Sequence, residues 1–263
     1  MEPSGALEHV EDEAFVIVKA APRVSQQYGA TVCCAAIDRN GSWVRLYPVS
    51  FRYLDQRQQF RRWDRIRYRW RRPRAAADQR GESRRVDDKS IEVIGALPKA
   101  ERSDLLHRTA VTSLKAERAA GRSLALLKME FVRFEVVRRS TEEVDRELAN
   151  RKAIREQGDM FQLSENVSAE ASPYSFKYTY RDDDGEHTGT CQDWETEATF
   201  LRRRHEFGSE AQALDWMQHK FGIDLPQRGI MLAMGTHRRW PDQWLINGVI
   251  QVGATPSPQG LLI

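Results

Sequence analysis

Residues 65–71 alternate strictly between charged and apolar side chains, and this pattern limits the segment to one kind of structure. The charged positions are Arg65, Arg67, Arg69 and Arg71, and the apolar positions are Ile66, Tyr68 and Trp70. A period of two is typical of a half-buried β-strand, because successive side chains of a strand point to opposite faces. The segment therefore predicts a strand with an exposed row of guanidinium groups, spaced about 7 Å apart.

This row lies in the most basic part of the chain. Between Arg52 and Arg85 there are thirteen arginines and four acidic residues, although the formal net charge of the whole chain is only +3. Acidic residues concentrate further on, between Asp182 and Glu197. Such an uneven distribution favours a polyanionic partner for the basic part. The alternative is a solvated face whose arginines form ion pairs, since arginine is the cation that this chain uses most.

Short apolar segments rich in β-branched residues are spread along the whole chain. They predict strands at 15–19, 31–37, 42–47, 91–94, 124–129, 131–137, 174–180, 230–234 and 244–252. Helical periodicity or charge patterning predicts helices at 99–120, 142–156, 196–204 and 210–221. Residues 51–60 are interpreted as a short helix or turn, and 71–88 and 235–243 as loops. Hairpins are expected at Asn40-Gly41 and at Asp183-Asp184-Gly185.

The order of these elements has no regular strand–helix–strand rhythm. It predicts an α+β fold with a mostly antiparallel, curved or barrel-like sheet and three or four helices. The expected domains are a β-rich domain with the basic strand at 14–140, a helical connector at 141–172 and an α+β domain at 173–263. One continuous core for both halves is the alternative.

Several classes of protein are excluded by what the sequence lacks. No apolar run reaches the 18 or so residues of a membrane span, and the acidic N-terminus is unlike a secretory signal. Three cysteines form no disulfide framework, so a cytoplasmic protein is expected. Phosphate loops, nucleotide-binding glycine motifs, the nucleophile elbow and Cys-x-x-Cys pairs are all absent. No motif identifies a cofactor, which therefore stays unknown.

A second polar group lies in the acidic stretch and consists of Glu186, His187, Cys191, Asp193 and Glu195. On an unbroken strand, His187, Cys191, Asp193 and Glu195 share a face. A histidine with carboxylates could act as acid and base, with or without a metal, so His187, Asp193 and Glu195 are the candidate catalytic residues. The alternative is structural: a turn at His187, a core position at Cys191 and a helix N-cap at Asp193.

A third group lies in the late loop, where Thr236, Arg238, Arg239 and Trp240 follow Gly235. A hydroxyl, two guanidinium groups and an indole suit an anion or a base, and a plain hairpin loop is the alternative. Among the aromatic residues near the basic strand, Trp63 is the candidate for base stacking, because Tyr68 and Trp70 share the apolar face of Ile66.

Several short motifs resemble a widespread prokaryotic family of uncharacterised proteins. They are Tyr28-Gly29, Thr31-Val32-Cys33, the run 41–48 followed by Phe51-Arg52, Asp193-Trp194-Glu195, Met234-Gly235-Thr236 and the run 244–248. The resemblance implies a compact bacterial or archaeal module. It also implies that Arg45, Arg52, Asp193, Glu195 and Thr236 are better candidates for a site than composition alone would make them.

Taken together, these patterns predict a cytoplasmic protein that binds DNA or RNA through its phosphate backbone. The expected contacts are Arg45, Arg52, Trp63, Arg65, Arg67, Arg69, Arg71, Thr236, Arg238, Arg239 and Trp240. One alternative is a hydrolase or nuclease-like enzyme that uses His187, Asp193 and Glu195. Another is an adaptor that docks a protein partner through its charged helix and acidic hairpin. No membrane partner is expected.

Overall fold

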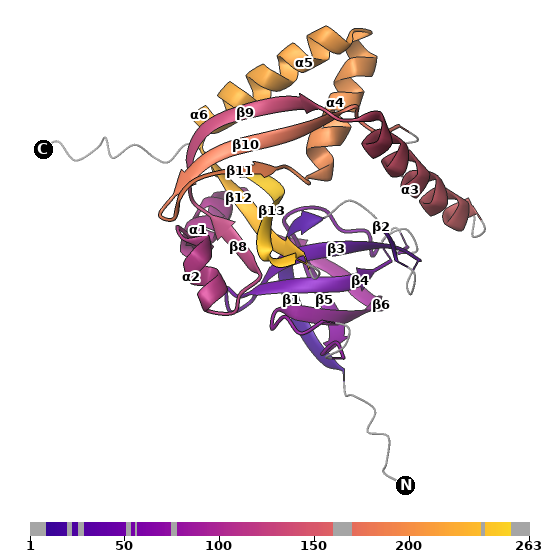
Figure 1. Cartoon of the computed structure of the whole chain (residues 1–263). Helices are drawn as coiled ribbons and strands as arrows, with labels where there is room; N and C mark the ends of the chain where they lie inside the picture. Colours follow the sequence, from indigo (N-terminus) through magenta and orange to yellow (C-terminus); the bar gives the residue numbers. More distant parts are fainter. Residues whose placement is uncertain are drawn as a thin grey trace, which may run out of the picture. The chain divides into compact units, whose positions relative to one another are not determined.

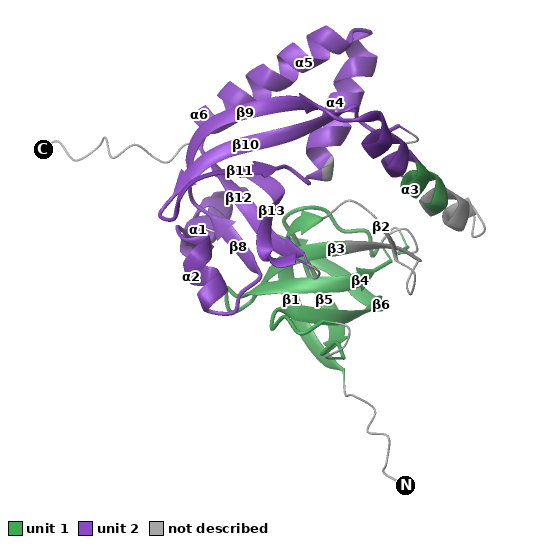
Figure 2. Ribbon diagram, in the orientation of Figure 1, with its two compact units in different colours: residues 1–97, 149–168 green, residues 98–148, 169–263 purple. Residues whose placement is uncertain are grey.

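The computed structural model describes residues 9–19, 23–25, 29–50, 54–55, 57–74, 78–159, 170–237 and 240–253. The chain divides into two compact units, shown in different colours in Figure 2. Unit 1 comprises residues 1–97 and 149–168, and unit 2 comprises residues 98–148 and 169–263. About 47% of the described residues are in strands and 30% in helices, which confirms the predicted α+β class.

Unit 1 is built around one sheet of six strands (Figure 1). The strands are β1 (Val10–Lys19), β2 (Arg23–Ser25), β3 (Gly29–Asp38), β4 (Trp43–Val49), β5 (Asp64–Arg71) and β6 (Ser83–Ala96). Their order is β1-β5-β6-β4-β3-β2, and all pairs except β4 with β6 are antiparallel. Because β1 also pairs with β3, the order β1-β5-β6-β4-β3 returns to its first strand.

The expected hairpin between β3 and β4 is confirmed, and its cause is local. The Asp38 Oδ1 accepts hydrogen bonds from the backbone N–H groups of Asn40 and Ser42, each at 2.9 Å. Gly41 has a φ of +79°, which glycine adopts without steric cost. One face of the resulting sheet is apolar, and its core includes Val16, Ala36, Val44, Leu46, Ile66 and Tyr68.

Unit 2 contains two sheets and most of the helices. The sheet of three strands has the order β11 (Gly185–Thr190), β10 (Tyr174–Asp182), β9 (Glu130–Arg138). The sheet of four strands has the order β13 (Trp240–Gln251), β12 (Ile230–His237), β8 (Leu124–Leu127), β7 (Ala110–Val111). The helices are α1 (Lys99–Thr109), α2 (Leu114–Ala119), α3 (Thr141–Asp159), α4 (Trp194–Phe207), α5 (Glu210–His219), a π-helical turn (Lys220–Asp224) and α6 (Leu225–Gln227). From residue 149 onward, α3 belongs to unit 1.

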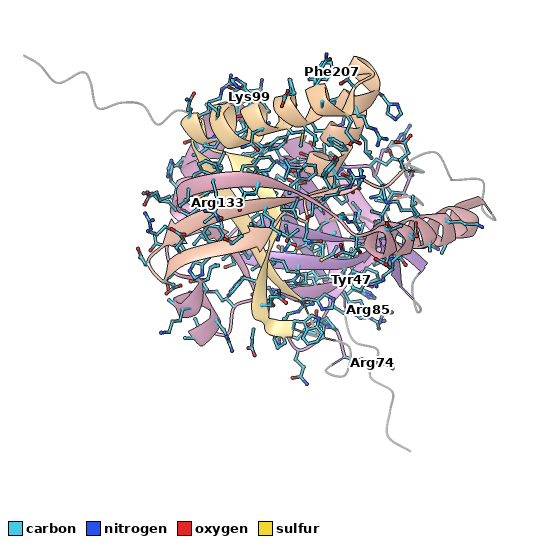
Figure 3. All side chains as sticks on the ribbon, turned by 45° about the horizontal axis from the view of Figure 1, so that its top comes forward. Tyr47, Arg74, Arg85, Lys99, Arg133 and Phe207 are labelled. Carbon is cyan, nitrogen blue, oxygen red and sulfur yellow. The ribbon has the colours of Figure 1, made fainter. Side chains whose placement is uncertain are left out.

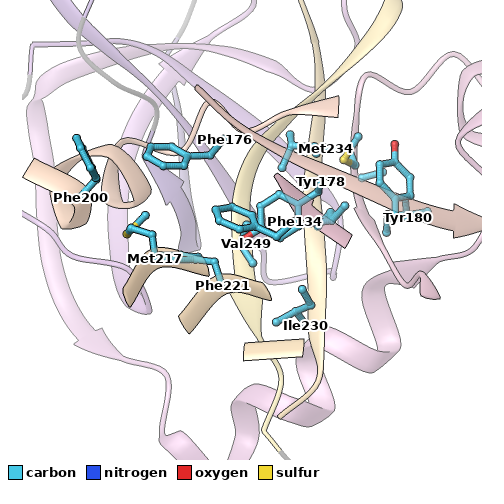
Figure 4. Close-up of a cluster of buried hydrophobic side chains, with 14 of the residues drawn as sticks. Phe134, Phe176, Tyr178, Tyr180, Phe200, Met217, Phe221, Ile230, Met234 and Val249 are labelled. Carbon is cyan, nitrogen blue, oxygen red and sulfur yellow. The ribbon is translucent and has the colours of Figure 1, made fainter. Parts of the chain in front are cut away.

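The core of unit 2 is aromatic and lies between its sheets and its helices α4 and α5. Phe134 of β9 stands among Phe176 and Tyr178 of β10 and Phe221 of the π-helical turn (Figure 4). These side chains are at most 9% exposed. Figure 1 shows α5 running beside β9, which it contacts. No helix in the described ranges is both long and apolar enough to cross a membrane.

The predicted number of helices was too low, because residues 99–120 form two helices rather than one. The described residues contain five α-helices of six or more residues, α1 to α5. Between α1 and α2, Ala110–Val111 pairs with β8 as the short parallel strand β7. The Ser113 side chain then accepts a hydrogen bond from Ala116 N and starts a new helix. The signal for this break is an N-capping serine after two β-branched residues, Val111 and Thr112. Apolar residues at helical spacing continue across the break, so the periodicity predicts one helix.

Two predicted loops are partly strand. The last third of the loop expected at 71–88 belongs to β6, which starts at Ser83 and is polar because its outer face is solvated. The loop expected at 235–243 is shorter, because β12 extends to His237 and β13 starts at Trp240. Of the helix or turn expected at 51–60, residues 51–53 and 56 lie outside the described residues, and 57–58 form a turn.

Candidate nucleic-acid interface

The basic strand has the predicted alternation. Ile66 and Tyr68 of β5 are fully buried in the core of unit 1, whereas Arg65 and Arg69 are exposed. The strand lies between β1 and β6, and it pairs with both in antiparallel register. The register places the row of arginines beside acidic residues of both neighbours, which are Glu11 and Glu13 on β1 and Asp87 and Glu92 on β6.

The first two arginines of the row share one carboxylate. Glu13 Oε2 lies 2.5 Å from the Nη2 of Arg65, and its Oε1 lies 3.1 Å from the Nη2 of Arg67. Burial acts to raise the pKa of Glu13, but the hydrogen bonds from Arg67 and Arg65 outweigh it and lower the pKa. Arg67 also lies 3.3 Å from Glu92 and 3.8 Å from Glu11. This part of the face therefore has the ion-paired character that was the alternative interpretation.

Arg69 is neutralised in the same way by a single partner. Its Nη2 lies 2.9 Å from the Oδ2 of Asp87, across the β5–β6 pair. Its backbone N–H donates to the Oγ of Ser90 at 2.8 Å. A phosphate that approaches Arg69 must therefore displace the carboxylate of Asp87, which is already in place.

The end of β5 differs from the rest of the row, because there arginine faces arginine. Arg71 is the cross-strand partner of Arg85, and Arg72 and Arg74 follow directly. Among the described residues, Arg71, Arg72 and Arg74 form no ion pair. We call these four residues (Arg71, Arg72, Arg74 and Arg85) the arginine cluster. Like charges directly opposite each other on a sheet destabilise it, so a contribution to stability does not explain the Arg71–Arg85 pair.

An aromatic residue adjoins the arginine cluster. The parallel register pairs Arg45 with Ser83 and Leu46 with Arg84, so Tyr47 comes beside Arg85 one residue further along. Tyr47 is half-buried, and Figure 3 shows Tyr47, Arg85 and Arg74 in the same region of unit 1. The outer face of β4, β6 and β5 thus presents a phenol ring and then two guanidinium groups on successive strands.

Arg45, a predicted contact, is not an exposed cation. Arg45 is only 6% exposed, and its Nη1 donates to the Sγ of Cys33 at 3.8 Å. Its backbone N–H donates to the carbonyl oxygen of Glu82 at 2.9 Å. A guanidinium in this position supports the sheet and is poorly placed to meet a phosphate.

The other predicted contacts are distributed over both units. Trp63 of unit 1 is half-buried with a φ of +77°, and its carbonyl oxygen accepts a hydrogen bond from Leu97 N at 2.8 Å. In unit 2, Thr236 is 5% exposed inside β12, whereas Trp240 is 62% exposed at the start of β13. Arg52, Arg238 and Arg239 lie outside the described residues. A single surface that joins these residues to the basic strand stays a prediction.

The candidate catalytic residues do not converge on one point. His187 lies opposite Tyr180 on β10, whereas the backbone N–H of Cys191 bonds Phe176 at the other end of that strand. Four residues of strand span about 13 Å. Asp193 is the N-cap of α4, because its side chain accepts a hydrogen bond from Glu195 N at 3.0 Å. The structural alternative for Asp193 is therefore confirmed, and Glu195 is exposed in the first turn of that helix.

His187 has a different carboxylate partner, Asp182, that the sequence did not single out. Its Nε2 lies 3.0 Å from the Oδ1 of Asp182, whose side chain is fully buried. The same Oδ1 accepts a hydrogen bond from Asp184 N at 2.8 Å and closes the predicted turn between β10 and β11. Within the described ranges, no group of three or more His, Cys, Asp or Glu side chains could hold a metal ion.

Asp78 supports the β5–β6 connection beside the arginine cluster. Its carboxylate accepts hydrogen bonds from Arg80 Nε and Nη2, both at 2.8 Å, and from the hydroxyl of Ser83 at 2.6 Å. Burial acts to raise the pKa of Asp78, but the bonds from Arg80 and Ser83 outweigh it and lower the pKa from 3.8 to about 2. The carboxylate thus favours the folded state while it is charged.

We expect Asp78→Asn to lower the free energy of unfolding by about 2 kcal/mol at pH 7. The stabilisation from a lowered carboxyl pKa is complete above the unfolded value, near pH 4, and is lost as the pH falls through the folded value of about 2. The difference between variant and wild type should therefore shrink between pH 4 and pH 2 in urea denaturation. A difference that does not change with pH would contradict this role of the carboxylate.

The arginine cluster was only partly predicted. Arg71 was named as the last residue of the row, but Arg72, Arg74 and Arg85 were assigned to a loop and Tyr47 was not considered. The local excess of arginine was the available signal. It gave no order of importance among thirteen arginines, because cross-strand partners cannot be read from charge counts.

Fold and site together define an α+β protein of two compact units, of which the first carries an arginine cluster at the end of a paired strand. The chain belongs to the family described as "Domain of unknown function (DUF8757)", whose model matches residues 107–260. A second family model, "Domain of unknown function (DUF8758)", matches residues 10–111. The predicted membership in a family of uncharacterised proteins is confirmed at this level.

Comparison with solved structures found similarity at low TM-scores. A structure described as "Molecular basis for abrogation of activation of pro-inflammatory cytokines" has a TM-score of 0.32 and 8% identity, and the match covers 72% of this chain and 79% of that one. A structure of a replication protein A heterotrimer bound to ssDNA has a TM-score of 0.26 and 10% identity, and the match covers 94% of this chain and 66% of that one. No curated protein matched the chain.

Proposed function

We propose that this protein binds nucleic acid through the arginine cluster of unit 1. The observation that carries the proposal is the juxtaposition of Arg71 and Arg85 across the β5–β6 pair, followed by the exposed Arg72 and Arg74. Guanidinium forks bind phosphate in bidentate fashion, and a polyanion offsets the repulsion between neighbouring arginines. A row of phosphates would therefore suit Arg71, Arg72 and Arg74, which form no ion pair among the described residues.

The rest of the basic face contributes less than its arginine content suggests. Arg65, Arg67 and Arg69 are held by Glu13, Glu92 and Asp87. These carboxylates compete with any incoming phosphate. We infer that the interface is centred on the end of β5 and not on its middle, and that Arg65, Arg67 and Arg69 serve mainly to pair β5 with its neighbours.

Other expectations from the sequence do not depend on this proposal. A barrel-like sheet in unit 1 is supported by the pairing of β1 with both β5 and β3. The domain limits at 140 and 172, the cytoplasmic location, the prokaryotic range and the contacts expected from Trp63, Thr236 and Trp240 stay predictions. Catalytic roles for His187, Asp193 and Glu195 also stay predictions, and the separation of His187 from Asp193 does not favour them.

The proposal is tested by comparing two double variants. Arg71→Ala/Arg74→Ala removes two cations that have no acid partner among the described residues, and Arg65→Ala/Arg67→Ala removes the same charge from the ion-paired part of the same strand. Binding is measured by fluorescence anisotropy with labelled single-stranded DNA, duplex DNA and RNA between about 50 and 200 mM salt.

We expect wild-type affinity to fall steeply with salt. In the Arg71→Ala/Arg74→Ala variant the slope on single strands should flatten by about 1.4, since each lost phosphate contact removes about 0.7. The Arg65→Ala/Arg67→Ala variant should keep most of the slope. Equal losses in both variants would move the interface to the whole strand. Absence of binding by the wild-type protein at about 50 mM salt would refute the function.

A further inference from the structure

The arginine cluster is small, and this limits how much polyanion it can hold. Arg71 and Arg85 stand on neighbouring strands, which lie about 4.8 Å apart. Arg74 follows Arg71 by only three residues, a span of at most about 10 Å. Such a group can meet two or three phosphates of one backbone, because successive phosphates of a strand are a few ångströms further apart than the strands of a sheet.

Beyond the cluster along β5, the same face turns neutral and then acidic. Arg69 is balanced by Asp87, and the next two arginines, Arg65 and Arg67, face three carboxylates of Glu11, Glu13 and Glu92. The side chains of Glu11 and Glu92 are 66% and 63% exposed. Glu11 is the cross-strand partner of Arg69, which lies two residues from Arg71, about 7 Å along the strand. An acidic flank thus begins about that far from the cluster.

On the other side of the cluster, no second row of exposed cations is present among the described residues of β4. The outer face of β4 carries the half-buried Tyr47 and the buried Arg45. A duplex brings two backbones, which are separated by grooves about 6 to 12 Å wide. The duplex is also stiff, so a backbone that lies on the cluster and runs along β5 continues over the acidic flank.

We propose that the arginine cluster takes a single strand of nucleic acid and that Glu11 and Glu92 discriminate against a duplex. The inference rests on the proposed function and adds the form of nucleic acid that the site accepts. A single strand has one backbone and can turn away from the flank. Its unstacked bases can also meet an aromatic ring, and Tyr47 stands one register step from Arg85.

The first test compares a labelled single strand with its own duplex at equal length and salt. We expect the wild-type protein to bind the single strand at least about tenfold more tightly. In Glu11→Gln/Glu92→Gln the affinity for duplex should rise by roughly tenfold and the preference should narrow, because the acidic flank is neutralised. Glu101→Gln/Asp104→Asn in α1 is the matched control, because it removes the same two negative charges elsewhere, and it should leave the preference unchanged.

The second test examines the ring. Tyr47→Ala should weaken single-strand binding by roughly tenfold with little change of the salt slope, whereas Tyr47→Phe should bind like the wild type. Circular dichroism and thermal melting check that both variants fold. Tyr47→Phe provides the comparison that stands if the alanine variant is unstable.

The outcomes separate the inference from the proposed function. If the wild-type protein binds neither form, the proposed function fails. If it binds the duplex as tightly as the single strand or more so, the function stands and the preference for a single strand is overturned. If Glu11→Gln/Glu92→Gln strengthens both forms equally, the acidic flank is not the cause of discrimination.

Discussion

Replacing Phe134 with alanine is expected to lower the free energy of unfolding of unit 2 by about 3–5 kcal/mol. Phe134 is 3% exposed and touches aromatic rings from three directions. Its ring centroid lies 6.0 Å from that of Phe176, 5.1 Å from that of Tyr178 and 5.7 Å from that of Phe221. These distances are typical of favourable aromatic pairs, which add to the area buried.

The size of this effect comes from the position of Phe134 between the sheet and the π-helical turn. The partners belong to β10 and to residues 220–224, so the surrounding backbone cannot collapse into the space that the lost ring would leave. A cavity of that kind adds its own cost to the lost transfer free energy. Truncation at Phe134 therefore loosens two elements at once.

The measurement is urea denaturation followed by circular dichroism, with Arg133→Ala as the control. Arg133 precedes Phe134 on β9, points to the other face and forms an exposed ion pair with Glu135 at 2.9 Å. Its replacement should change the free energy of unfolding by less than about 0.5 kcal/mol. Similar losses for both variants would show that the aromatic cluster is not the centre of stability in unit 2.

Replacing Asp193 with alanine is expected to lower the free energy of unfolding by about 2–4 kcal/mol. The Oδ1 of Asp193 accepts from Glu195 N at 3.0 Å, and its Oδ2 accepts from Val249 N at 3.3 Å. The residue is only 6% exposed, so alanine would remove the cap of α4 and also the buried carboxylate oxygen that accepts from Val249 N. The carboxylate thus joins α4 to β13.

Asp193→Asn provides a finer test, because an amide keeps one acceptor oxygen and replaces the other with a donor. We expect a loss of about 1–3 kcal/mol, since the amide oxygen can accept from only one of the two backbone N–H groups. Glu195→Ala, an exposed change in the first turn, should cost less than about 1 kcal/mol. A catalytic Asp193 without a structural role would instead leave thermal stability unchanged in Asp193→Asn.

Local sequence patterns predicted the structure correctly where it depends on residues that are close together in the sequence. The alternation at 65–71, the turn at Asp38–Ser42 and the turn at Asp182–Gly185 all matched the structure. The helix expected at 142–156 lies inside α3 (Thr141–Asp159). Residues 83–90 failed as a prediction, because their strand is stabilised by backbone pairing with β5 and has few apolar side chains to reveal it.

The candidate site was harder to predict, because its character depends on residues far apart in the chain. Glu13 neutralises Arg65 across 52 positions of sequence, and Asp182 takes the place beside His187 that Asp193 was expected to fill. The four arginines of β5 look equivalent in the sequence. Their neighbours make three of them structural cations and leave the last one beside another arginine.

The sequence alone determined the α+β class, the basic strand with its buried and exposed faces, and the tight turns, because each depends on periodicity or on side chains a few residues apart. The tertiary structure alone decided which arginines are neutralised and that Asp193 caps a helix. Ion pairing depends on strand register, and register is set by the packing of whole strands against a core. Whether an arginine is neutralised depends on residues that are far away in the sequence, and only the fold brings these residues together.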